Sequence, residues 1–142
     1  MNIIVSIDGS KHSSKAIDYL IKNSSMFDGK GSNLIVLHVQ PDIIPPEVTQ
    51  YVPKKSINDW YADQGKAAVK AAVAKLDKAG INYKLVNKVG HVADTILAEA
   101  KTCKADMIVM GSHGRSSLMN LIMGSIATQV LSQAKQPVLI VK

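Results

Sequence analysis

Short apolar runs separated by polar stretches mark the expected β-strands of this chain. Four of the runs are nearly continuous in Val, Ile, Leu and Met, a pattern typical of strands buried on both faces of a parallel sheet. The run at residues 82–89 instead alternates apolar and polar positions, which indicates a strand buried on one face, at a sheet edge. The expected strands are Asn2–Ile7, Asn33–Val39, Asn82–Val89, Asp106–Met110 and Pro137–Val141.

Between these strands the apolar spacing changes to that of amphipathic helices. Apolar residues recur every three or four positions over residues 12–26, 56–79, 92–100 and 126–134. Gly80 and Pro137 are suited to ending the second and the last of these helices. Strands and helices thus alternate along the whole chain.

This alternation predicts an α/β fold, because parallel strands need crossover helices and the crossovers are right-handed. We expect a doubly wound, Rossmann-like, five-stranded parallel sheet with helices on both faces, in a single domain over residues 1–142. The fold class, rather than the pattern itself, suggests the strand order 3-2-1-4-5. In that order the carboxyl ends of the first and fourth strands are neighbours, at the point where such folds bind ligands.

Composition and charge narrow the class further. The chain has 142 residues, 46% of them hydrophobic, which is enough for a core. No apolar run approaches the roughly 20 residues of a membrane helix. The N-terminus has the pattern of a strand rather than of a signal peptide, and the single cysteine, Cys103, allows no internal disulfide. We therefore expect a cytoplasmic protein with no membrane partner.

The formal net charge of +6 raises the possibility of a nucleic-acid partner. The lysines are spread along the chain, however, and the sequence has few aromatic residues that could stack on bases. We favour a solvated lysine surface over a nucleic-acid face.

The strongest candidate for chemistry is a glycine loop after the fourth expected strand. The strand runs into Gly111 and Gly114, and Gly124-Ser125 then begins the last helix. Glycine lets a backbone approach an anion, and the free N–H groups of a helix start point toward it. Arg115, the only arginine of the chain, lies in this loop and could pair with phosphate oxygens.

The loop is neither of the two commonest phosphate-binding motifs. No Gly-Lys-Ser/Thr follows Gly111 at the Walker A spacing, and the first strand ends in Asp8-Gly9-Ser10 rather than in Gly-x-Gly-x-x-Gly. A structural alternative is that the glycines only form turns. For Asp8 the alternatives are a role beside phosphates, through a bridging metal ion, and capping of the first helix.

The motif and several strands resemble those of the universal stress protein family. The spacing Gly111-x2-Gly114-x9-Gly124-Ser125 is similar to the ATP-binding motif of that family. Residues 3–10, 34–39 and 136–141 resemble its first strand and turn, its second strand and its last strand. The resemblance covers the whole chain, and the intact motif places the chain with the ATP-binding branch.

The resemblance implies a role for each part of the site. Asp8 would lie near the ribose and phosphates, often with Mg²⁺ or Mn²⁺, and the backbone of Val39 would contact the adenine edge. The other expected contacts to the cofactor ATP are Ser10, Met110, Gly111, His113, Gly114, Arg115, Gly124, Ser125 and Ile126. The implied partner besides the nucleotide is a second copy of the chain, paired through the last strand, Val138–Val141.

Binding is better supported than catalysis. Phosphoryl transfer needs a group that orients the attacking atom, and only Asp8 and His113 are candidates near the loop. We expect an ATP-binding stress-response protein that signals through nucleotide-dependent conformation or association. The alternative is a slow ATPase or phosphotransferase on the same fold. The proline-rich segment Gln40–Lys55 could cover the same crevice or form a surface loop.

Overall fold

The computed structural model describes residues 1–114 and 123–142 and contains one parallel sheet. Its strand order is β3-β2-β1-β4-β5, and every neighbouring pair is parallel. The α/β fold class and the order 3-2-1-4-5 expected from the sequence are therefore confirmed. The strands are β1 (Asn2–Ile7), β2 (Asn33–Pro41), β3 (Lys84–Gly90), β4 (Met107–Gly111) and β5 (Val138–Val141).

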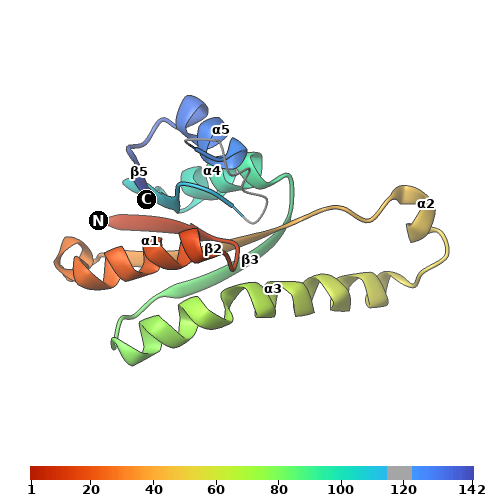
Figure 1. Cartoon of the computed structure of the whole chain (residues 1–142), viewed down its shortest axis with the longest axis horizontal. Helices are drawn as coiled ribbons and strands as arrows, with labels where there is room; N and C mark the ends of the chain where they lie inside the picture. Colours follow the sequence, from red (N-terminus) through yellow and green to blue (C-terminus); the bar gives the residue numbers. More distant parts are fainter. Residues whose placement is uncertain (115–122) are drawn as a thin grey trace.

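Helices cover both faces of this sheet (Figure 1). One face carries α1 and α3, and the other carries α4 and α5. The short helix α2 and the first turns of α3 extend beyond the sheet. The helices are α1 (Lys11–Lys22), a 3₁₀ turn (Ser24–Phe27), α2 (Pro46–Thr49), α3 (Lys54–Lys78), α4 (Val92–Thr102) and α5 (Ser125–Gln133).

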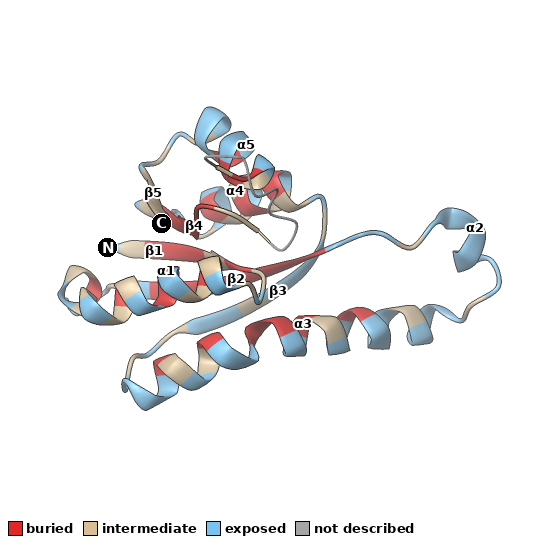
Figure 2. Ribbon diagram, viewed as in Figure 1, coloured by how far each residue is buried: buried red, intermediate tan, exposed pale blue. Residues whose placement is uncertain are grey.

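The central strands are apolar at successive positions because each strand supplies two cores. Along β1, Ile3 and Val5 pack with α1 and α3, whereas Ile4 packs with α4 and α5. Val36 and Leu37 divide β2 in the same way. All five side chains are fully buried, as the buried residues of the middle strands show in Figure 2. Full burial of each such side chain stabilises the fold by about 1.5–3 kcal/mol.

The strand β3 is less buried than its alternation predicts. It begins at Lys84 rather than Asn82, and Leu85, expected on its apolar face, is 39% exposed. Tyr83, just before the strand, does pack against the core. An edge strand has a neighbour on one side only, so its side chains receive less cover.

The proline-rich segment has more structure than the sequence indicates. The strand β2 continues to Pro41, α2 lies inside the segment, and Pro53 precedes α3. The segment leads away from the sheet (Figure 1), and none of its residues lines the cavity described below. Within the described residues, no helix is both long and apolar enough to cross a membrane.

Candidate functional site

The carboxyl ends of β1 and β4 lie side by side, because these strands pair through Ser6 and Met110. A cavity of about 60 Å³ opens there, on the face covered by α4 and α5. Its lining combines several of the residues expected at the nucleotide site with neighbours from α1, α4 and α5. The lining residues are Ser6, Ile7, Asp8, Ser13, Val39, Val92, Met110, Gly111, His113, Gly114, Ile126 and Ala127.

The turn after β1 holds Asp8 in place. Gly9 has φ of +81°, which reverses the chain without strain in a glycine. The Ser10 N–H donates to Asp8 Oδ1 (2.9 Å), and the Ser13 N–H donates to the Ser10 hydroxyl oxygen (3.2 Å). The N-cap of α1 is therefore Ser10 and not Asp8. The other carboxylate oxygen of Asp8, Oδ2, lies beside Gly114.

Gly111 is required by the packing of β4 against α1. A Cβ at this position would lie 2.6 Å from both the backbone carbon and the carbonyl oxygen of His12. Real Cβ atoms do not approach backbone so closely. The sequence interpretation gave Gly111 a role in cradling the nucleotide, and the structure adds a role in holding the first turn of α1 against the sheet.

Gly114 and Gly124 are also closely surrounded. A Cβ on Gly114 would lie 3.0 Å from Asp8 Oδ2, and one on Gly124 would lie 3.2 Å from the His113 Cα. The Gly124 N–H donates to the Ser112 carbonyl oxygen at 2.7 Å, so this N–H is already engaged. We expected this N–H to meet phosphate, and in the structure it bonds to the protein instead.

The start of α5 completes the arrangement. Gly124 is its N-cap, and Ser125 and Ile126 are its first residues. N–H groups in the first turn of a helix lack intrahelical acceptors and favour anions. Ile126 lines the cavity, whereas Ser125 is exposed and Ser10 lies in the adjoining turn. Arg115 lies outside the described residues, so its expected contact with phosphate stays a prediction.

The sequence interpretation missed His12 as a neighbour of the site. Its ring centroid lies 4.9 Å from that of His113, whose Nδ1 is 2.9 Å from the Ser112 Oγ. His12 Nδ1 is buried and has no hydrogen-bond partner among the described residues. The one sequence signal for this placement is that His12 follows Asp8 by four residues, at the start of an expected helix.

Burial lowers the pKa of His12 below its ordinary value of 6.5. The nearby positive groups His113, Lys11 and Lys15 act in the same direction, and Asp8 opposes them. The unfolded chain then takes up a proton on His12 at a higher pH than the folded chain does. By linkage, the stability that comes from keeping His12 neutral in the folded chain is fully present above about pH 6.5, and it is lost as the pH falls.

We therefore expect the free energy of unfolding to fall as the pH drops from about 6.5. In His12→Gln the free energy of unfolding should change less steeply with pH. Urea unfolding of both proteins between about pH 5 and pH 7.5 measures the effect. His91→Gln is the control, because His91 is exposed and paired with Asp94. An unchanged slope in His12→Gln would contradict this role of burial.

The metal site expected at Asp8 has a limited set of protein ligands. The described residues contain no group of three or more His, Cys, Asp or Glu side chains that could hold a metal ion. Mg²⁺ commonly uses one or two carboxylates together with substrate phosphates. The single carboxylate of Asp8 therefore fits an ion that a nucleotide helps to bind, and it does not fit a metal site made by protein side chains alone.

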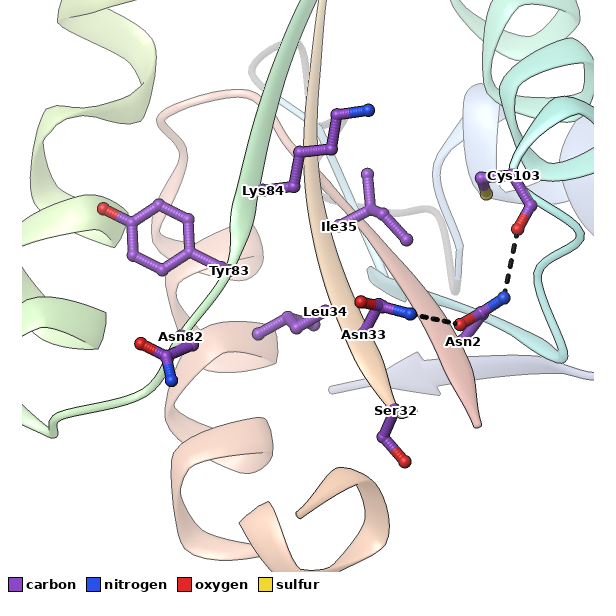
Figure 3. A pocket seen from close by; sticks show the side chains of 9 residues that line it. All are labelled: Asn2, Ser32, Asn33, Leu34, Ile35, Asn82, Tyr83, Lys84 and Cys103. Carbon is purple, nitrogen blue, oxygen red and sulfur yellow. Dashed lines mark hydrogen bonds between the residues drawn. The ribbon is translucent and has the colours of Figure 1, made fainter. Parts of the chain in front are cut away.

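A larger cavity of about 420 Å³ lies at the opposite, amino-terminal end of the strands (Figure 3). Its asparagine side chains are bonded within the protein: Asn33 Nδ2 donates to Asn2 Oδ1 (2.9 Å), and Asn2 Nδ2 donates to the Cys103 carbonyl oxygen (3.2 Å). Ligands of doubly wound sheets bind beyond the carboxyl ends of strands. We therefore keep the smaller cavity as the candidate site.

Cys103, which lines that larger cavity, packs against the core at the end of α4. Burial, with the nearby charge of Glu99, raises the pKa of its thiol. Because the thiolate is the reactive form, we predict that iodoacetamide alkylates Cys103 several-fold more slowly in the folded protein than in urea at neutral pH. Equal rates in the two states would contradict this prediction.

The comparisons with known proteins agree over the whole chain. The sequence model of the universal stress protein family matches residues 1–142. Universal stress protein MJ0531 of Methanocaldococcus jannaschii is 29% identical over 140 residues, covering 99% of this chain and 81% of that protein. Universal stress protein YxiE of Bacillus subtilis is 29% identical over 147 residues, covering 99% of this chain and 97% of that protein.

Solved structures share the fold. MJ0577, described as a hypothetical protein whose biochemical function was assigned from its structure, has a TM-score of 0.83 at 24% identity, covering 99% of this chain and 94% of that one. A universal stress protein from Archaeoglobus fulgidus in complex with dAMP has a TM-score of 0.68 at 21% identity, covering 100% and 98%. A family protein from Arabidopsis thaliana with AMP bound has a TM-score of 0.69 at 19% identity, covering 100% and 91%. The family model matches the full length of the chain, and the strand order agrees with the solved structures of the family. The chain therefore belongs to the universal stress protein family.

Proposed function

We propose that this chain binds ATP in the cavity between β1, β4 and α5 and acts as a nucleotide-dependent regulatory protein of the stress response. The observation that carries the proposal is the convergence of Asp8, Val39, Gly114 and Ile126, from distant parts of the sequence, on one cavity. Members of the family with AMP or dAMP bound support adenine nucleotides as the ligand class.

The adenine would lie toward Val39. Val39 is 4% exposed, and its side chain belongs to the core under α4 and α5. Its place in the lining of the cavity suits a flat apolar ring against that core. Because valine has no polar side-chain atom, the adenine edge would be recognised by backbone groups.

The phosphates would lie toward α5. The N–H groups of Ser125 and Ile126, the Ser125 hydroxyl and the Arg115 guanidinium would bind phosphate oxygens. Asp8 would share an Mg²⁺ or Mn²⁺ ion with them, and this ion would offset the repulsion between the carboxylate and the phosphates. The missing side chains of Gly114 and Gly124 would leave room for this contact.

Binding of a whole nucleotide requires the site to open. The cavity of about 60 Å³ is smaller than typical ligand pockets of about 300–1,000 Å³. Such opening would give the nucleotide a means of changing the shape of the protein, as a regulatory role requires. Any ATP hydrolysis would be slow, below the rate of about 1 s⁻¹ at the lower end of typical enzymes.

Isothermal titration calorimetry with ATP, AMP and cAMP, each with and without Mg²⁺, tests this function. We expect one saturable site, with ATP bound more tightly than AMP and strengthened by Mg²⁺. Asp8→Asn should remove most of the Mg²⁺ effect while leaving AMP binding largely unchanged. Absence of saturable heat for every nucleotide up to about 1 mM would contradict the proposal.

A homodimer through β5 is a second part of the proposal. In the described sheet β5 is an edge strand that pairs with β4, and its four apolar residues are half-buried. Bare apolar edges tend to pair, and two like edges close by twofold symmetry. Light scattering should give a mass near twice 15.3 kDa, and Ile140→Lys should shift it toward the monomer. A monomer at micromolar concentration would contradict this assembly.

A further inference from the structure

A second cavity, of about 360 Å³, lies on the opposite face of β2 from the candidate nucleotide site. We call it the α3–β3 groove and define it by His38, Gln40, Tyr61, Gly65, Lys66 and Asn87. Its volume is in the range of small-molecule pockets. The groove and the first site are separated by β2, because alternate residues of a strand point to opposite faces.

The floor of the groove is a pair of buried polar side chains on β2. His38 and Gln40 are only 2% and 6% exposed. His38 Nδ1 lies 2.8 Å from the carbonyl oxygen of Ile7; because a carbonyl only accepts, Nδ1 donates in this bond. His38 Nε2 lies 3.2 Å from Gln40 Oε1. A neutral ring that donates from Nδ1 accepts at Nε2, so this bond forms with the Gln40 amide turned to present its N–H₂ group.

That bond uses only one polar atom of the Gln40 amide. The other atom has no hydrogen-bond partner in the described part of the chain, and it is not among the fully buried unbonded atoms, so solvent reaches it. Because Gln40 lines the groove, this amide atom is accessible to a polar group of a bound molecule.

The wall formed by α3 is shaped to leave this floor accessible. Gly65 lies in the interior of a 25-residue helix, where glycine lowers helix stability. A Cβ there would lie 3.4 Å from Asn87 Oδ1 and 3.7 Å from His38 Cδ2, so a side chain longer than alanine would fill the space above His38. Glycine at this position keeps the groove open.

The aromatic part of the wall is held in place before any ligand binds. Tyr61, one turn before Gly65, is buried, and its hydroxyl donates to Asp42 Oδ1 at 2.7 Å. The same hydroxyl accepts the Ile44 N–H at 3.3 Å. These bonds fix the ring, and a preorganised wall lowers the entropic cost of binding.

The charge of the lining selects the ligand class. The lining includes two lysines and no carboxylate. The Lys88 ammonium lies 3.7 Å from Glu99 on α4, at the opposite face, which leaves Lys66 as the cation of the groove. An anion is therefore favoured over a cation, and the Tyr61 and His38 rings favour an aromatic body.

We propose that the α3–β3 groove binds a small aromatic carboxylate that carries a second hydrogen-bonding group. The ring would lie against Tyr61, the carboxylate would face Lys66, and the second polar group would bond to the free amide atom of Gln40. This site is independent of nucleotide binding, since none of these residues lines the other cavity.

The sole tryptophan gives a local readout. The Trp60 ring centroid lies 5.3 Å from that of Tyr61, so occupancy of the groove should change its fluorescence. The probes are 4-hydroxybenzoate and its uncharged counterpart 4-hydroxybenzamide. We expect a saturable change with both and a higher affinity for the carboxylate.

Three variants test the assignment. Lys66→Gln should weaken 4-hydroxybenzoate about two- to fivefold, the range of an exposed ion pair, and leave 4-hydroxybenzamide unchanged. Lys70→Gln, one turn further along α3 and outside the lining, should change neither affinity. Ala62→Leu, at an exposed position of the lining, should abolish binding of both probes without unfolding the protein.

The proposal is overturned if the folded wild-type protein gives no saturable signal with either probe. It is also overturned if Lys70→Gln and Lys66→Gln have equal effects, or if amide NMR shifts caused by the probe gather at residues 8–13 and 110–114. Each of these results is distinct from a failure of ATP binding, which calorimetry measures separately.

Discussion

Gly111→Ala is expected to lower the free energy of unfolding by about 3 kcal/mol, the upper end of the usual cost of overpacking. The new Cβ would lie 2.6 Å from the carbonyl carbon and oxygen of His12. These are backbone atoms of the first turn of α1, so no change of rotamer can relieve the overlap. Either β4 or α1 must shift, and both belong to the core.

Urea unfolding of the variant and the wild type measures this loss, which corresponds to a fall of about 6–12 °C in Tm for a chain of this size. Gly29→Ala is the matched control, because its Cβ would meet only the Ser32 Oγ at 3.6 Å. Equal stability of Gly111→Ala and Gly29→Ala would show that α1 does not pack on β4 as described.

The second large effect is on nucleotide binding. Gly114→Ala and Gly124→Ala should each weaken ATP at least about tenfold, or about 1.4 kcal/mol. On Gly114 the added methyl group would push against Asp8 Oδ2, 3.0 Å away. On Gly124 it would press on the backbone of His113 and Gly114, at 3.2 and 3.4 Å.

The two variants should lose similar affinity for ATP but differ in their free energy of unfolding. This difference separates an effect on binding from an effect on folding. The methyl group on Gly114 would meet one side-chain oxygen rather than backbone, so Gly114→Ala should lose less stability than Gly124→Ala. Gly124→Ala crowds backbone atoms and should be less stable. Calorimetry with ATP on the folded variants gives the affinities, and wild-type affinity in both would remove these glycines from the nucleotide site.

The strands were predictable because burial on both faces leaves a direct pattern in the sequence. Runs such as Ile3-Ile4-Val5 supply alternate side chains to two cores, so nearly every position must be apolar. The order of the strands came from the fold class. The limits of β3 were less predictable, because an edge strand can expose apolar residues such as Leu85 and Val89.

The part of the candidate site formed by the glycine loop was predictable, because the glycines lie where the backbone passes close to other groups. Gly114 lies against Asp8, about a hundred residues earlier in the chain, as a site at adjoining strand ends requires. The placement of His12 and the contact of Gly111 with α1 depend on how a helix packs on the sheet. The α3–β3 groove depends on how α3 packs over β2, with Gly65 above His38, and the sequence pattern does not show this packing.

An NMR titration with ATP and Mg²⁺ tests the location of the nucleotide site most directly. We predict that the largest amide shifts fall on Asp8–Ser13, on Val39, on Met110–Gly114 and on Ser125–Ala127, and that they saturate together. Shifts that saturate elsewhere, for example along α3 and β3 alone, or an unchanged spectrum at saturating nucleotide, would contradict a nucleotide site between β1, β4 and α5.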